Sequence, residues 1–193
     1  GRALLAAHPE CDVIVSDDGF DGAVISTAGL NQISENTAAS DSAVPAASRA
    51  ADASSCAVTV SCGSGIPTAS LVSFCTAQAL SGMEQFAGLP RTAGGALFMN
   101  ARCFDKTISD VLSGADYIDP ESLEVVHYEF SAGDWDYKKS PFQGTHRIIV
   151  QAYFNLVRRG MSDKELSSGG MPAAREQIAA ECRKYIGERI SKG

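Results

Sequence analysis

The residues best suited to chemistry in this sequence are its six cysteines, at positions 11, 56, 62, 75, 103 and 182. A structural zinc site needs closely spaced Cys or His pairs, because four ligands must reach one tetrahedral centre. The closest pair, Cys56 and Cys62, has five residues between its members, and the three histidines are scattered along the chain. The spacing therefore argues against a metal site.

A disulfide between Cys56 and Cys62 depends on the path of the chain between them. If "CAVTVSC" forms a straight strand, the two Cα atoms lie about 20 Å apart at roughly 3.3 Å per residue, which is too far to bridge. The bridge therefore requires this segment to turn back on itself. In an oxidising compartment such a turn would make the chain a disulfide-containing secreted or lumenal binding domain, which remains one alternative.

Enzymatic nucleophiles have little support in the sequence. A catalytic cysteine needs a base within reach and a lowered pKa, and no Cys/His signature surrounds Cys75 or Cys103. The stretch "CGSGIP" lacks the G-x-S-x-G elbow of serine hydrolases, and neither "CGSG" nor "GGAL" has the pattern of a phosphate-binding loop. We therefore predict that the protein is not an enzyme, with a nucleophilic Cys75 or Cys103 as a further alternative.

Cysteine can also anchor a prosthetic group through a thioether. Such a site needs an accessible thiol, an apolar surface, and a carboxylate or arginine to bind the polar edges of the group. The stretch "NARCFDK" places Arg102, Cys103 and Asp105 together, and "AECRKYIGER" places Cys182 beside Arg183. The alternative is that Cys103 and Cys182 are small buried hydrophobic residues on helix faces.

The elements that would position these residues are predicted to be mainly helical. Apolar residues at intervals of three and four favour helices over residues 68–82, 92–114, 145–160 and 172–193. The segment 119–130 fits a helix or a strand, and 131–144 is a loop that contains the single Trp. Two β-branched runs, Val13–Val15 and Val24–Ile25, are separated by Asp and Gly and indicate a small N-terminal hairpin.

The expected fold class is therefore mainly α, with several amphipathic helices joined by long irregular segments. Residues 31–55 have no apolar periodicity and are rich in small polar residues. We accordingly divide the chain into an extended or irregular N-terminal arm, residues 1–55, and a mostly helical region, residues 56–193.

Charge is unevenly distributed along the chain, whose net charge is −7. Residues 136–193 hold 11 Lys and Arg against 6 Asp and Glu, whereas residues 1–135 hold 5 against 17. The acidic part would repel phosphate, so we expect no nucleic-acid partner. No apolar run is long enough to cross a membrane. The opposite charges favour docking onto other proteins.

The C-terminal stretch "RIIVQAYFNLVRRGMSDKELSSG" is similar to a helix and the following turn in phycobilisome rod linkers. The matching residues are Ile148 or Ile149, Ala152, Tyr153, Arg158 or Arg159, Glu165 and Leu166. The stretch "NARCFDK" also resembles the chromophore helices of phycobiliproteins, in which an Asp follows the Cys. On these residues, with several cysteines and long irregular segments, the chain resembles a red-algal phycoerythrin γ subunit or a related rod linker.

The resemblance implies a light-harvesting linker of the phycobilisome, at the stromal face of the chloroplast thylakoid membrane. Its partners would be phycobiliprotein α and β subunits, whose hexamer cavity it would thread, and other linkers. Its cofactors would be thioether-linked open-chain tetrapyrroles, phycourobilin or phycoerythrobilin. The residues expected to hold them are Cys56, Cys62, Cys75, Cys103, Cys182, Arg102 and Asp105.

Overall fold

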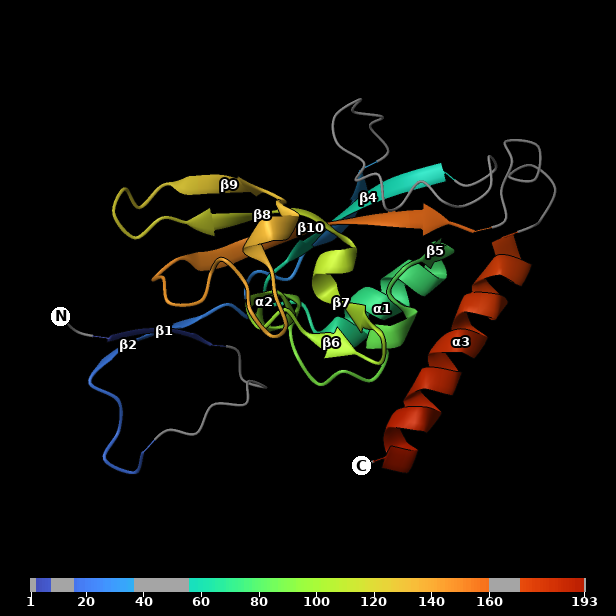
Figure 1. Ribbon diagram of the computed structural model, residues 1–193, viewed down its shortest axis with the longest axis horizontal. Coiled ribbons are helices and arrows are strands. Elements are labelled where there is room, and N and C mark those ends of the chain that lie inside the picture. Colours follow the sequence, from blue (N-terminus) through green and yellow to red (C-terminus); the bar gives the residue numbers. More distant parts are fainter. Residues whose placement is uncertain (1–2, 8–15, 37–55, 160–170, 193) are drawn as a thin grey trace.

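The computed structural model describes residues 3–7, 16–36, 56–159 and 171–192 (Figure 1). Its centre is an antiparallel sheet in the order β3-β4-β10-β8-β9, with the short strand β5 paired to one end of β10. The strands are β3 (Ile33–Asn36), β4 (Cys56–Gly63), β5 (Leu80–Ser81), β8 (Leu112–Ile118), β9 (Val125–Glu129) and β10 (Ile148–Arg158). The long central strand β10 therefore joins the two halves of the sheet.

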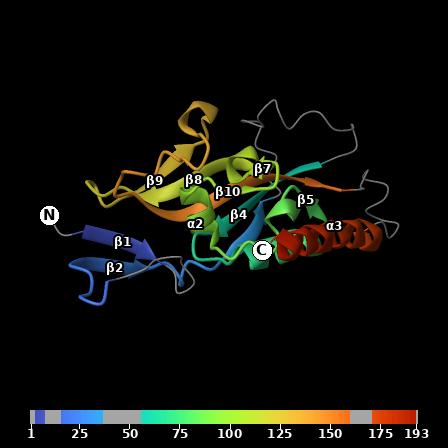
Figure 2. The ribbon, with the colours of Figure 1, turned by 60° about the horizontal axis from the view of Figure 1, so that its bottom comes forward.

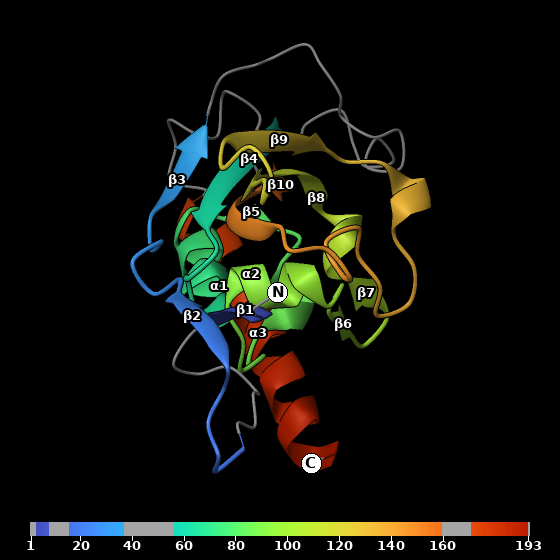
Figure 3. The same ribbon diagram turned by 90° about the vertical axis from the view of Figure 1, so that its left-hand side faces the viewer.

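The helices lie mostly on one face of this sheet, as Figure 3 shows for α1 and α2. They are α1 (Thr68–Ala77), α2 (Ala93–Phe98) and α3 (Met171–Lys192), with short 3-10 turns η2 (Glu84–Phe86), η3 (Ile108–Asp110) and η4 (Ala132–Asp134). The core between sheet and helices contains the fully buried side chains of Phe86, Phe142, Phe154, Leu71 and Leu156. None of the described helices is both long and apolar enough to cross a membrane.

Two smaller pairs of strands complete the architecture. Strand β1 (Ala3–Ala7) pairs in parallel with β2 (Gly22–Ser26) and forms a unit that projects from the main body on the side away from α3 (Figure 2). Strands β6 (Arg102–Cys103) and β7 (Lys106–Thr107) form a tight antiparallel pair below the sheet.

The expected mainly α fold is wrong, because the molecule is a mixed α/β structure built on an antiparallel sheet. The clearest error is residues 145–160, where strand β10 replaces the expected helix. The register of β10 shifts between Ile149 and Gln151 and again between Tyr153 and Phe154. The first irregularity places the buried residues Ile149 and Ala152 three apart, whereas Ala152, Phe154 and Leu156 alternate as in a regular strand. The apolar residues between them, such as Tyr153 and Val157, complete a spacing that imitates a helical face.

The expected helix at 92–114 is also mostly wrong. Its first part forms α2, which is the only α-helix in this range. The chain then passes through β6, β7 and η3 into β8. The ambiguous segment 119–130 contains strand β9. Helices are confirmed at α1 and α3, although α1 ends five residues before the expected stop at Gly82.

The expected N-terminal hairpin is replaced by a different pairing. Val24 and Ile25 lie in β2, whose described partner is the parallel strand β1, while Val13–Val15 lies outside the described residues. The described part of the expected arm therefore contains strands β1, β2 and β3, and residues 37–55 are not described. The division of the chain at residue 55 stays a prediction.

Candidate functional site

The candidate site is built around a close meeting of three backbone segments, which we call the glycine junction: Thr27–Leu30, Gly63–Gly65 and Ala93–Gly95. A Cβ atom at Gly63 would lie 2.3 Å from the Leu30 carbonyl oxygen, and one at Gly65 would lie 1.9 Å from the Thr27 carbonyl oxygen. A Cβ at Gly94 would lie 2.6 Å from the Ser64 Cβ. Side chains at these three positions would overlap neighbouring atoms, so the junction requires glycine.

Backbone hydrogen bonds fix the three segments to one another. The Gly65 N–H donates to the Leu30 carbonyl at 3.0 Å, and the Gly63 N–H donates to the Gln32 carbonyl at 2.8 Å. The Gly94 N–H donates to the Ser64 carbonyl at 2.9 Å. The junction thus ties the end of β4, the start of α2 and the segment after β2 into one rigid corner.

The hydroxyl of Ser64 is the unusual group at this corner. Ser64 is 2% exposed, and its Oγ has no hydrogen-bond partner among the described residues. Leaving a buried hydroxyl without a partner costs about 1–3 kcal/mol. The nearby Thr92 hydroxyl, by contrast, accepts the Gly95 N–H at 3.2 Å and caps α2. Ser64 Oγ therefore marks a place where a further polar atom is needed.

The loop formed by residues 131–143 docks on the opposite end of α2. Ser140 Oγ and Gln143 Nε2 both donate to the Phe98 carbonyl, at 2.7 and 2.9 Å. The Asn100 side chain donates to the Asp136 carbonyl at 2.9 Å. Because α2 has only six residues and rises about 1.5 Å per residue, the Phe98 carbonyl that Ser140 and Gln143 bind lies roughly 9 Å along the helix from its start at the glycine junction.

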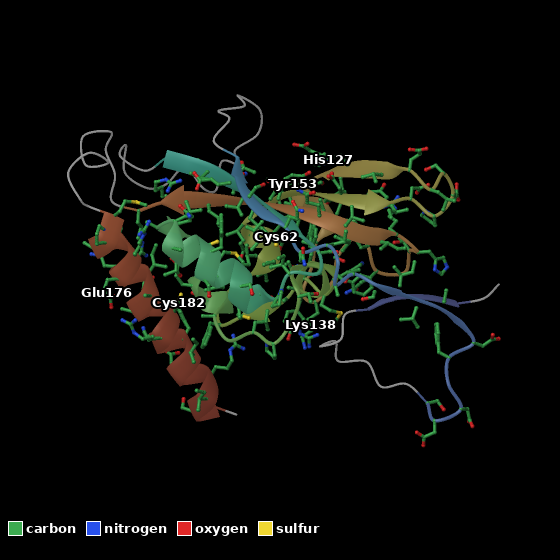
Figure 4. The ribbon with its side chains drawn as sticks, turned by 180° about the vertical axis from the view of Figure 1, so that it is seen from behind. Cys62, His127, Lys138, Tyr153, Glu176 and Cys182 are labelled. Atoms are coloured by element: carbon green, nitrogen blue, oxygen red, sulfur yellow. The ribbon has the colours of Figure 1, made fainter. Side chains whose placement is uncertain are left out.

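This loop presents a cation and aromatic surface. Lys138 has a φ of 55°, a left-handed conformation that is uncommon outside glycine, and its ammonium group lies 5.5 Å from the Tyr137 ring centroid. Tyr137 is 65% exposed, and Phe98 and Met99 at the end of α2 are each 38% exposed. Figure 4 shows Lys138 in the lower half of the view, below the sheet. A cation beside exposed apolar groups suits an anionic ligand with a flat ring.

A second polar cluster lies away from this site. Asp116 accepts hydrogen bonds from the Tyr153 hydroxyl and from His127 Nδ1, both at 2.6 Å. Desolvation, and then the bond to Asp116, raise the pKa of Tyr153 to about 12. In Figure 4 the labelled His127 and Tyr153 lie on the sheet, well apart from Lys138. The cluster links β8, β9 and β10 and is not part of the candidate site.

The structure scatters the cysteines that were expected to hold a cofactor. Cys62, Cys75, Cys103 and Cys182 are buried free thiols in the core, and Cys56 begins strand β4. Burial raises the pKa of Cys62 to about 12 and raises that of Cys75 further, and desolvation also raises that of Cys182. Thiols in this state are poor nucleophiles.

The other expected residues lie on the β6–β7 pair. Arg102 is exposed, and its Nε donates to the Phe104 carbonyl at 3.4 Å, while Asp105 is exposed in the turn. Cys103 between them is buried, so the three side chains do not face a common site. That any of these seven residues contacts a cofactor stays a prediction.

The disulfide alternative is not supported. Strand β4 runs from Cys56 to Gly63 without turning back, and Cys62 is a free thiol. No group of three or more His, Cys, Asp or Glu within the described ranges is arranged to hold a metal ion.

Sequence reasoning missed the glycine junction although its signal was present. "GSG" follows a β-branched run and precedes a helix, which is the strand–turn–helix context in which glycines permit close backbone contact. The stretch lacks the complete G-x-G-x-x-G pattern, so the sequence alone does not identify it as a binding loop. The sequence also does not show that Gly94, about thirty residues later, meets the same turn.

Comparison with known proteins finds similarity to reductases along most of the chain. It is 35% identical over 198 residues to the UDP-N-acetylenolpyruvoylglucosamine reductase of Treponema denticola, across 94% of this chain and 51% of that protein. The enzyme of the same name from Treponema pallidum is 29% identical, across 94% of this chain and 54% of that protein. The chain therefore spans about half the length of these curated relatives. No protein-family model matches the chain.

Solved structures agree on the fold. The crystal structure of UDP-N-acetylenolpyruvylglucosamine reductase (MurB) from Thermus caldophilus superposes with a TM-score of 0.54 at 22% identity, covering 67% of this chain and 42% of that one. A solvent-stable cholesterol oxidase has the same TM-score at 15% identity, covering 81% of this chain and 30% of that one. The chain thus shares a fold with these proteins.

These findings overturn the resemblance to phycobilisome linkers. The relatives are named as reductases from bacteria, so the expectations of a non-enzymatic light-harvesting linker and of a chloroplast thylakoid location are wrong. The expected phycobiliprotein partners and bilin cofactors are wrong for the same reason. Within the stretch that carried this similarity, Ile148–Arg158 form the strand β10 and not a linker helix.

Proposed function

We propose that this chain is the cofactor-binding part of a UDP-N-acetylenolpyruvoylglucosamine reductase and that its cofactor is FAD. The observation that carries the proposal is the 35% identity to such a reductase along 94% of the chain. The shared fold with MurB supports it. The substrate would be a UDP-sugar bearing an enolpyruvoyl group, and the reaction would reduce that group.

The residues of the candidate site fit a flavin dinucleotide. Such a ligand combines a flat aromatic ring system with many polar atoms, and it needs a backbone that can approach it closely. The glycine junction offers that backbone, and the buried Ser64 Oγ lacks a polar partner among the described residues. Exposed Phe98 and Met99 give an apolar surface for a ring to pack on.

The chemistry is the addition of a hydride and a proton to the two carbons of a double bond. Bound FAD, once reduced by an external hydride donor, would supply the hydride and return to its oxidised form. The described residues contribute binding and orientation. Lys138 would neutralise part of the negative charge of the UDP diphosphate, since an exposed ammonium group pairs well with phosphate oxygens. Tyr137 and α2 would limit the access of water to the reacting group.

The proposal is tested by loading the purified chain with FAD and separating free cofactor by gel filtration. We expect visible flavin absorbance to elute with the protein at about one FAD per chain. The variant Ser64→Ala should retain less FAD, because a buried hydrogen bond to the ligand is lost. Ser70→Ala is the matched control, since Ser70 is exposed on α1. If the unmodified chain elutes without flavin, the proposal is wrong.

A further inference from the structure

The hydroxyl of Tyr128, on strand β9, forms hydrogen bonds with three residues of the loop that carries Lys138. It donates to Asp134 Oδ2 at 2.9 Å and accepts the Trp135 indole N–H at 3.0 Å and the Ser131 backbone N–H at 3.3 Å. Burial raises the pKa of Tyr128, so the hydroxyl keeps the proton that it donates to Asp134. One hydroxyl therefore holds the whole first part of the loop.

The ring of Tyr128 holds both ends of the same loop. Its centroid lies 6.4 Å from that of Trp135 and 5.5 Å from that of Phe142. Trp135 and Phe142 also contact each other edge to face, with centroids 6.3 Å apart, and Phe142 is fully buried. Edge-to-face pairs of this kind stabilise a defined geometry beyond simple burial.

The tip of the loop lies between these two anchors. The backbones of Asp136 and Lys139 are bonded in both directions, at 3.2 and 3.0 Å, and Lys138 sits inside this turn with its left-handed backbone. A non-glycine residue in that conformation is less stable by about 1 kcal/mol, so its surroundings must hold it there.

We propose that Tyr128 is a positioning residue, whose hydroxyl fixes the loop of residues 131–143 so that Lys138 is presented beside α2 for an anionic ligand. The inference rests on the proposed function, because the ligand class is the diphosphate of a UDP-sugar. It adds a residue that does not touch the ligand and acts through Lys138.

Two variants separate the hydroxyl from the aromatic packing. Tyr128→Phe removes the hydroxyl and keeps the ring. Tyr117→Phe is the matched control, because Tyr117 packs on the same Phe142 and its hydroxyl makes no hydrogen bond within the described part of the chain. Trp135 is the only Trp in the sequence, so its fluorescence reports on the loop directly.

The first measurement is acrylamide quenching of Trp135 in the ligand-free chain. We expect stronger quenching in Tyr128→Phe than in the unmodified chain or in Tyr117→Phe. The second is calorimetric titration of the FAD-loaded chain with UDP, for which Tyr128→Phe should bind about fivefold more weakly, as one lost hydrogen bond predicts. In a Lys138→Ala background the same change should have no further effect.

Unchanged quenching in Tyr128→Phe would overturn the inference at its first step. Stronger quenching in Tyr128→Phe with unchanged UDP affinity would show that the hydroxyl only stabilises the loop, and would overturn the positioning role. An unmodified FAD-loaded chain that binds no UDP would also overturn that role, because Lys138 would then have no such ligand. The positioning role would also be overturned if Tyr128→Phe weakened UDP binding equally in the unmodified and the Lys138→Ala backgrounds. Failure of the proposed function is read separately, from the absence of retained FAD in the unmodified chain.

Discussion

Replacing Gly65 with Ala tests the glycine junction most directly. The new Cβ would lie 1.9 Å from the Thr27 carbonyl oxygen and 2.8 Å from its carbon, and both are backbone atoms that no rotamer change can move. Ordinary van der Waals contact begins near 3.4 Å. The segments must therefore separate by roughly 1.5 Å, well beyond what a packed interior absorbs.

The size of the effect follows from what that separation breaks. The Gly65 N–H···Leu30 and Gly63 N–H···Gln32 hydrogen bonds join the same two segments, and each contributes about 1 kcal/mol. Overpacking in a dense region adds about 1–3 kcal/mol. We expect Gly65→Ala to lower the free energy of unfolding by about 3–5 kcal/mol in total.

The assay is urea denaturation followed by circular dichroism, with Gly29→Ala as the matched control. Gly29 lies in the facing segment, and a Cβ there meets no atom within 4 Å. With an m-value of about 2 kcal/mol per molar urea, the midpoint of Gly65→Ala should fall by about 1.5–2.5 M, and that of Gly29→Ala should barely change. Equal midpoints for the two variants would refute the close approach of the segments.

Ser64→Ala should leave the ligand-free chain as stable as before or more stable by about 1–2 kcal/mol, because a buried unpartnered hydroxyl is removed; thermal unfolding without flavin measures this, and a clear loss would mean that the hydroxyl has a partner in the protein. Burial and the bond to Asp116 raise the pKa of Tyr153 from 10 to about 12 on folding. The contribution of the protonated Tyr153 to the free energy of unfolding is therefore complete below pH 10 and is lost as the pH rises to about 12. The urea midpoint of the unmodified chain should fall across that pH range. The midpoint of Tyr153→Phe should fall less, because phenylalanine cannot ionise. The four buried thiols Cys62, Cys75, Cys103 and Cys182 should react with a thiol reagent at pH 8 only after denaturation, and fast labelling of any of these four in the native chain, located by peptide mass mapping, would contradict their burial.

The sequence predicted local features better than the sheet. The sequence predicts helices α1 and α3, because local signals such as Pro67 before the first turn of α1 lie within one short stretch. Strand β10 was not, because its bulges depend on pairing with β8 and its spacing alone is ambiguous. Pairing between distant strands is not encoded in any short window of residues.

The candidate site escaped prediction for a related reason. The glycine junction brings together residues near positions 28, 64 and 94, so no single stretch contains its pattern. The cysteines are conspicuous in the sequence, yet the structure buries four of them as ordinary core residues. Lys138 is likewise unremarkable in sequence and becomes notable only through its backbone conformation and its place beside α2.

The position of β10 at the middle of the sheet has a consequence for how the protein is made. β4 and the β8–β9 pair are synthesised before β10, yet within the described residues they pair with each other only through β10. Until Arg158 has left the ribosome, the apolar inner faces of β4 and β8 have no strand to join them, so assembly of the sheet must wait for pairings nearly one hundred residues apart. Pairing between such distant segments slows folding, and it leaves the edges of β4 and β8 unpaired until β10 is available.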